Sequence, residues 1–150
     1  MPGLYYEQFN VGQTFEHSVS RTVTEMDNML FSCLTLNTQP LHIDAEFASH
    51  TEFGRPLVNS LFTLGLLIGM TVADTTLGTT IANLGLGETN FPHPVFQGDT
   101  LRARTQVRSV RASNSRQNAG LIEFEHTALK QNGEVVCRCV RTALMLRLPS

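Results

Sequence analysis

Residues 59 to 73 place apolar side chains on nearly every side of a helix, and this pattern constrains the fold more than any other. The apolar residues are Leu61, Phe62, Leu64, Leu66, Leu67, Ile68, Met70 and Val72. A helix that is apolar all round must be covered by other structure. Polar residues and two glycines interrupt the stretch, so it is too short and too polar for a membrane span. We therefore expect a buried helix about 22 Å long, wrapped by the rest of the chain.

Several other segments have the apolar–polar alternation that is typical of β-strands. We predict strands over residues 14–23, 81–91, 101–110, 121–129 and 134–148. Apolar residues alternate with arginines in the segment 101–110, which indicates a half-exposed strand. The dipeptide Asn132-Gly133 between the last two segments is a strong hairpin signal. If about five strands form a curved antiparallel sheet around the apolar helix, the helix and the inner face of the sheet bury each other. We therefore predict an α+β fold.

A helix is expected between the first strand and the apolar segment. Thr24 is a suitable N-cap, and the acids Glu25 and Asp27 suit the positive end of the helix dipole. Apolar residues then recur at three-to-four spacing as far as Leu36, which predicts one buried face. That face consists of Met26, Met29, Leu30, Cys33 and Leu34. A shorter helix from about residue 44 to 50 follows, with Asp44 as its cap.

The chain of 150 residues suits one domain, residues 1–150, because this length buries a core without disulfides or metals. The net charge of -2 at pH 7 argues against nucleic-acid binding, because a negatively charged protein does not attract a polyanion. Three cysteines without zinc spacing indicate a reducing cytoplasm. The first residues lack the basic and apolar regions of a secretory signal. We expect no bound metal, because the histidines lack ligand spacing. They are His17, His42, His50, His93 and His126.

The polar stretch from Asn37 to Asp44 lies between the two expected helices and is the candidate functional site. Pro40 pushes Gln39 toward extended backbone, so no helix runs through the stretch. The bent connector allows the side chains of Asn37 and His42 to point into one pocket. A histidine can accept and return a proton near neutral pH. The alternative is a plain helix-to-helix turn with a capping asparagine and an exposed histidine.

The same stretch resembles the motif of the MaoC-like, (R)-specific enoyl-CoA hydratases. That motif reads Asp-x-Asn-Pro-x-His, often with another Asp two residues later. Pro40, His42 and Asp44 match it, whereas Asn37 stands at the place of the catalytic Asp and Gln39 at the place of the Asn. The resemblance covers nearly the whole chain and implies the hot-dog fold, a curved sheet around a central helix. It also implies a homodimer, an acyl-CoA substrate and no separate cofactor.

In that family the Asp and His of the motif hold one water and shuttle its proton. Carried over, His42 is the base and acid, whereas Asn37 can orient the water but cannot accept its proton. The resemblance puts the oxyanion donor at the backbone N–H of Ser60, where the family has Gly preceded by His and this chain has Asn59. Helix capping by Asn59 and Ser60 is the alternative, and the two roles can coexist. We favour a site in which His42 transfers the proton and Asn37 positions the water. In one alternative, Asp44 supplies a carboxylate. In the other, the site binds acyl-CoA with little turnover.

Further residues around the motif are expected to contact the substrate. They are Gln39, Asp44, Asn59, Arg55 and Phe91. This variant of the motif, followed by Asn-Ser rather than His-Gly, resembles relatives that act on short branched or carboxylated acyl groups such as mesaconyl-CoA. Arg55, or an arginine of the strand 101–110, is the expected partner of such a carboxylate or of the CoA phosphates.

Two other classes of function remain as alternatives. Hot-dog thioesterases generally place a catalytic Asp or Glu on or near the central helix. No acid lies between Pro56 and Ala73 in this chain, and Asp74 comes only at the far end. A catalytically weak acyl-CoA-binding protein would keep its affinity after loss of His42, whereas a hydratase would lose about 10²-fold or more of its rate.

Overall fold

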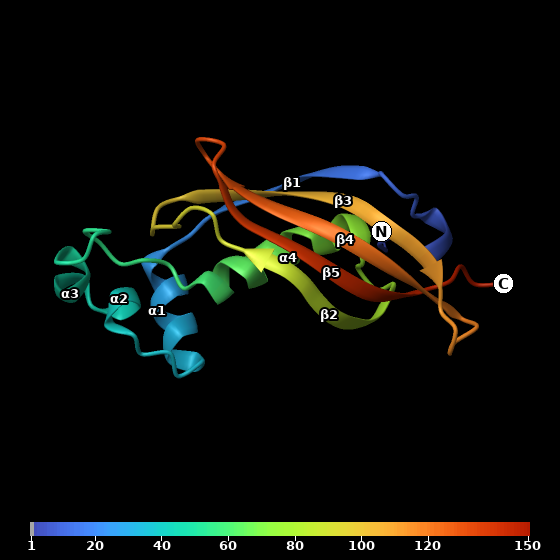
Figure 1. The fold of residues 1–150 in the computed structure, drawn as a ribbon, viewed down its shortest axis with the longest axis horizontal. Helices are drawn as coiled ribbons and strands as arrows, with labels where there is room; N and C mark the ends of the chain where they lie inside the picture. Colours follow the sequence, from blue (N-terminus) through green and yellow to red (C-terminus); the bar gives the residue numbers. More distant parts are fainter. Residues whose placement is uncertain (1) are drawn as a thin grey trace.

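The computed structural model describes residues 2–150, which fold around one antiparallel sheet of five strands in the order β1-β3-β4-β5-β2. The strands are β1 (Thr14–Thr22), β2 (Thr80–Asn90), β3 (Thr100–Ala112), β4 (Ala119–Lys130) and β5 (Val135–Leu146). The helices are the 3-10 turn η1 (Tyr6–Gln8), α1 (Glu25–Leu34), α2 (Pro40–Ile43), α3 (Ala45–Ser49) and α4 (Ser60–Thr75). The predicted α+β class and the predicted strands are confirmed. Figure 1 shows α4 lying along the curved sheet, with α1, α2 and α3 grouped beyond one end of it.

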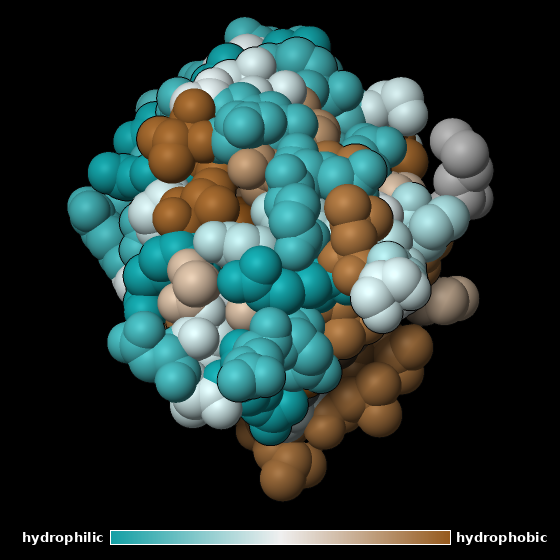
Figure 2. Space-filling model, turned by 90° about the vertical axis from the view of Figure 1, so that its right-hand side faces the viewer, coloured by the Kyte–Doolittle hydropathy of each residue, from teal (hydrophilic) through white to brown (hydrophobic). Residues whose placement is uncertain are grey.

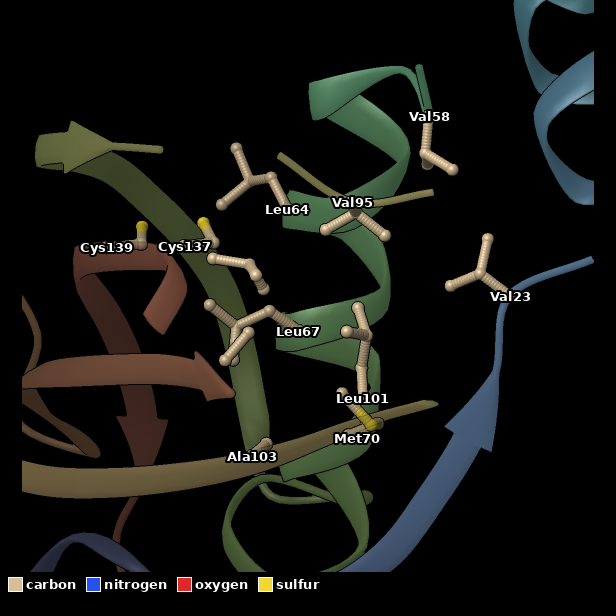
Figure 3. Packing of buried hydrophobic residues seen from close by; sticks show 12 residues of the cluster. Val23, Val58, Leu64, Leu67, Met70, Val95, Leu101, Ala103, Cys137 and Cys139 are labelled. Carbon is tan, nitrogen blue, oxygen red and sulfur yellow. The ribbon is translucent and has the colours of Figure 1, made fainter. Parts of the chain in front are cut away.

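The apolar helix α4 packs one side against the sheet. Leu64, Leu67 and Met70 enter a cluster with Leu101 and Ala103 of β3 (Figure 3). Cys137 and Cys139 of β5 belong to the same cluster, so both thiols are core residues. The burial of β3 residues 101, 103, 105 and 107 against exposed residues 102, 104, 106 and 108 confirms the alternation predicted there.

The other side of α4 is open to solvent, so the prediction of a helix wrapped on every side is wrong for this chain by itself. Leu61 is 59% exposed, and Gly65, Gly69 and Ala73 continue the same exposed row. These residues recur every four positions, so they form a single stripe along the helix. One curved sheet covers only the side of the helix that faces it, so this stripe stays exposed.

The orientation of α1 is a second correction. Its start is as predicted, because Thr24 accepts from the Asp27 N–H and Asp27 accepts from the Thr24 N–H. The predicted buried face, in contrast, points outward. Met26 is 73% exposed, Leu34 is 72% exposed, Leu30 and Cys33 are also exposed, and Met29 is only half-buried. The residues that α1 buries are Asn28 and Ser32, whose polar groups bond to the segment before α4 and to its N-cap.

Glycines at two turns have the backbone geometry that the sequence predicts. Gly133, in the hairpin between β4 and β5, has φ of 87°, and Gly98, in the turn before β3, has φ of 97°. Both values lie in the left-handed region, which glycine adopts without a steric penalty. Across residues 2–150, no helix is both long enough and apolar enough to cross a membrane.

Candidate functional site

The connector after α1 begins with a Schellman turn. The Leu36 N–H donates to the Cys33 carbonyl at 3.1 Å, and the Asn37 N–H donates to the Ser32 carbonyl at 2.8 Å. This pattern needs a left-handed residue, usually glycine, just after the helix. Leu36 fills that place with φ of 60°, as the only non-glycine residue with positive φ between residues 2 and 150. The turn therefore fixes the backbone of Asn37, whose exposed side chain accepts from the Gln39 N–H at 3.3 Å.

His42 lies on the short helix α2, which Pro40 begins. Gln39 has φ of -56° and ψ of 121°, the extended conformation that a following proline favours. The His42 Nδ1 lies 2.7 Å from the Leu57 carbonyl oxygen. A carbonyl only accepts hydrogen bonds, so Nδ1 carries the proton of the neutral ring and Nε2 holds the lone pair. His42 is half-buried, and its Nε2 has no hydrogen-bond partner among residues 2–150.

Asn28 connects His42 to the start of α4, and the sequence interpretation did not identify it. Its side-chain amide donates to the His42 carbonyl at 3.1 Å and to the Leu57 carbonyl at 3.0 Å. Its Oδ1 accepts from the Asn59 N–H at 2.9 Å. Asn28 is completely buried. The signal that could have revealed it is the pair of polar residues Asn28 and Ser32, four positions apart on one face of α1.

The first turn of α4 presents a free N–H. Asn59 is the N-cap, and its Oδ1 accepts from the Leu61 N–H at 3.0 Å. The Asn59 carbonyl accepts from the N–H groups of Phe62 and Thr63. Within residues 2–150, the Ser60 N–H is left without an acceptor. It lies at the positive end of a helix of 16 residues, where a developing negative charge is stabilised.

A cavity of about 290 Å³ opens beside this helix start. One wall contains Phe53, Ser60 and Thr63, and the other contains residues 91–95 with Val136. Two residues predicted to act in the site, Ser60 and Phe91, therefore line one space. The Thr63 hydroxyl is buried without a hydrogen-bond partner among residues 2–150. Leu57 is also part of the lining, and its carbonyl accepts from the ring of His42, which itself does not line the cavity.

The loop that forms the second wall is fixed from β4 and its turn. The Lys130 ammonium donates to the Pro94 carbonyl at 3.1 Å and lies 3.5 Å from Asp99 Oδ2. Asp99 Oδ2 accepts from the Phe96 N–H at 2.8 Å, and Asp99 Oδ1 accepts from Gln131. Burial disfavours the charged form of Asp99, but these hydrogen bonds and the Lys130 charge outweigh it and lower its pKa.

The remaining predicted residues have other contacts. Asp44 caps α3 by accepting from the Phe47 N–H at 3.0 Å, as expected for its capping role. The Arg55 guanidinium lies 3.9 Å from the centre of the Phe96 ring. Six predicted residues do not form part of the cavity lining: Asn37, Gln39, His42, Asp44, Arg55 and Asn59. The arginines of the strand 101–110 are on the exposed face of β3, opposite the face that packs on α4.

No group of three or more His, Cys, Asp or Glu residues between positions 2 and 150 is arranged to hold a metal ion. The site therefore offers an imidazole lone pair, a helix-end N–H and neutral amide and hydroxyl groups. This set suits proton transfer next to a carbonyl whose oxygen becomes negative.

Comparison with known proteins identifies the family of this chain. The family described as the MaoC like domain matches residues 7–128. A mesaconyl-CoA hydratase of Cereibacter sphaeroides is 34% identical over 143 residues, which are 95% of this chain and 41% of that protein. The chain thus spans about two fifths of the length of this curated relative.

Two solved structures share the fold. A protein from Archaeoglobus fulgidus, described as a monoamine oxidase regulatory protein, has a TM-score of 0.87 and 31% identity, with 99% of this chain and 98% of that chain covered. A Mycobacterium tuberculosis protein described as having a double hotdog fold has a TM-score of 0.87 and 24% identity, with 99% of this chain and 46% of that chain covered. The hot-dog fold predicted from the sequence is confirmed, and the chain belongs to the MaoC-like domain family.

Proposed function

We propose that this chain is a hydro-lyase that adds water reversibly to the double bond of a 2-enoyl-CoA thioester. The observation that carries the proposal is a hydrogen-bond network that joins the His42 ring to the residues just before the free N–H at the start of α4. His42 is held by the Leu57 carbonyl, three residues before Ser60, whose N–H is unpaired within residues 2–150. The mesaconyl-CoA hydratase named above supports the same chemistry by its similarity to nearly all of this chain.

The proposed reaction balances without any cofactor. His42 Nε2 takes a proton from water while the water oxygen bonds to the β-carbon of the enoyl thioester. The electron pair of the double bond moves toward the thioester oxygen, and the Ser60 N–H stabilises the resulting negative charge. His42 then returns its proton to the α-carbon, so that the net change is the addition of one water. Asn37 orients the water, because an amide can bond to it but cannot accept its proton.

The substrate that we propose has a short acyl group that is branched or carboxylated, of which mesaconyl-CoA is the example. The cavity of about 290 Å³ is small and mostly apolar, which favours a short acyl chain. Phe91 lines it, whereas Gln39, Asp44 and Asn59, which were also expected to contact the substrate, do not. Arg55, stacked on Phe96, remains the candidate partner for a carboxylate or a CoA phosphate.

A homodimer in the cytoplasm is part of the proposal. Large apolar side chains are exposed on α1, on α4 and on the edge strand β2, among them Leu30, Leu61, Leu84 and Leu86. Figure 2 shows apolar side chains gathered at the lower edge of one end of the molecule, below a mostly polar face. Exposed apolar patches typically mark interaction surfaces. The double hotdog relative, of which this chain covers 46%, supports pairing with a second unit of the same fold.

The test is to incubate the purified protein with mesaconyl-CoA and with crotonyl-CoA while following enoyl absorbance and free thiol together. A hydratase removes the enoyl signal and releases no thiol. Release of thiol without loss of the enoyl signal would contradict the proposal and indicate a thioesterase. That outcome is not expected, because α4 carries no acid before Asp74 and thioesterases of this fold rely on one. Binding of either thioester without turnover would identify an acyl-CoA-binding protein instead.

A further inference from the structure

Asn28 occupies an unusual position for an asparagine in the middle of a helix. It lies in α1, 10 residues long, with no exposed surface. A buried amide is costly unless its donors and acceptor are bonded. Both side-chain N–H groups and the side-chain oxygen of Asn28 have backbone partners. All three partners belong to the segments that carry the proposed reaction.

We propose that Asn28 is a positioning residue that holds His42 and the start of α4 in one fixed frame. It is completely buried and does not line the cavity, so it acts through its neighbours. Its bond to the His42 carbonyl fixes α2, and its bond from the Asn59 N–H fixes the residue before Ser60. This inference rests on the proposed hydratase function, whose reacting groups these are.

The shared carbonyl of Leu57 is the physical link between Asn28 and the imidazole. A carbonyl oxygen has two lone pairs. Asn28 Nδ2 occupies one at 3.0 Å, and His42 Nδ1 occupies the other at 2.7 Å. The direction of this carbonyl decides which ring nitrogen of His42 carries the proton. Asn28 therefore stabilises the tautomer whose lone pair is on Nε2, the atom that the reaction needs.

A second asparagine extends this network toward the helix. Asn59 donates its side-chain N–H to the Ser32 hydroxyl at 3.3 Å and caps the Leu61 N–H with its oxygen. Ser32 lies one turn after Asn28 on α1 but bonds to neither His42 nor Leu57. The pair thus provides a matched comparison on one helix face. Loss of Asn28 should disturb the imidazole, whereas loss of the Ser32 hydroxyl should not.

The experiment compares Asn28→Ala, Asn28→Ser and Ser32→Ala with the unaltered chain. Imidazole ¹⁵N resonances of His42, assigned by their absence in His42→Gln, report the tautomer in the folded protein. The kinetic constants kcat and KM for mesaconyl-CoA report positioning, and circular dichroism confirms that each variant is folded. Asn28→Ser keeps one hydroxyl donor and should give results between those of Asn28→Ala and the unaltered chain. It replaces Asn28→Ala in the comparison if that variant does not fold.

We expect the Nδ1–H tautomer to predominate in the unaltered chain and both tautomers to be populated in Asn28→Ala. In the same variant kcat should fall about tenfold or more, with KM changed about threefold or less, because misplacement affects the reacting groups rather than ground-state binding. Ser32→Ala should leave the His42 tautomer and the kinetic constants as they are in the unaltered chain. A single Nδ1–H tautomer together with an unchanged kcat in the folded Asn28 variants would overturn the inference. If the unaltered chain hydrates no thioester, the proposed function fails, whereas the tautomer comparison still decides the role of Asn28.

Discussion

Lowering the pH from 7 to 5 should destabilise the protein through one buried histidine, His126. A directed chain of hydrogen bonds crosses the sheet at this residue. Arg141 Nε donates to His126 Nε2 at 3.1 Å, so His126 Nδ1 carries the proton and donates to the Thr105 hydroxyl at 2.8 Å. The Thr105 hydroxyl then donates to His17 Nε2 at 2.8 Å, and His17 Nδ1 donates to Asp74 at 2.6 Å. The bond from Arg141 requires a neutral His126, because a protonated Nε2 has no lone pair to accept it.

Burial and, next, the positive charge of Arg141 lower the pKa of His126 from 6.5 to about 3. Below pH 6.5, His126 is therefore protonated in the unfolded chain but stays neutral in the folded chain. The contribution of neutral His126 to the free energy of unfolding is fully present above pH 6.5 and is lost as the pH falls toward 3. At pH 5, about 1.5 pH units below the unfolded pKa, the loss from His126 is about 2 kcal/mol. It would reach about 4 kcal/mol near pH 3.

Urea unfolding at several values between pH 5 and pH 7 measures this loss. His126→Gln keeps a polar side chain but removes the titration, so its stability should vary less with pH, by about 2 kcal/mol over this range. His50→Gln removes an exposed histidine instead and should keep the slope of the unaltered chain. Equal slopes for His126→Gln and the unaltered chain would show that His126 does not cause the loss of stability.

Three further substitutions test individual features. Leu36→Gly should stabilise the protein by about 0.5–1 kcal/mol in thermal unfolding, because glycine relieves the left-handed strain but adds unfolded-state entropy; a lower Tm would contradict this. Thr63→Val should raise the free energy of unfolding by about 1 kcal/mol, since it removes a buried hydroxyl without a partner; a loss in urea unfolding would argue against it. Asn37→Asp should raise kcat for mesaconyl-CoA by up to about 10²-fold, because a carboxylate can share the water proton with His42; a decrease would count against a water site at Asn37.

The sheet was predictable because its signals are local. Alternation decides which side of a strand is buried, and the paired pattern of Leu101 and Arg102 in β3 shows this directly. The Asn132-Gly133 turn needs a left-handed glycine, which the sequence provides. The Thr24 cap of α1 depends only on residues within one turn. Each of these features is decided by near neighbours, so the sequence contains the information.

The orientation of α1 was not predictable in the same way. Its apolar stripe has helical spacing, but spacing does not tell whether the stripe meets the core of this chain or another surface. The decisive contacts join Asn28 to Leu57 and Asn59, about 30 residues away along the chain. Nothing near Asn28 in the sequence identifies those partners. The same limit explains the open side of α4, because its extreme apolarity does not reveal how far one sheet can cover it.

The candidate site was predictable in part. The spacing of Pro40, His42 and Asp44 identified the motif, and the confirmed cap at Asp44 follows from local geometry. The cavity is different, because its walls come from residues 53–63, 91–95 and 136, which only the folded sheet brings together. Ser60 and Phe91 lie in that lining, whereas the catalytic roles proposed for Asn37, His42 and Ser60 stay predictions.

The central claim is that His42 transfers the proton during hydration of an enoyl-CoA thioester. The most direct test is kcat for mesaconyl-CoA in the unaltered chain and in His42→Gln, measured as the loss of enoyl absorbance. Glutamine can still bond to the Leu57 carbonyl but cannot exchange a proton near neutral pH. We expect kcat to fall by about 10²-fold or more, as for loss of a general base. Turnover by His42→Gln at the rate of the unaltered chain would contradict the mechanism.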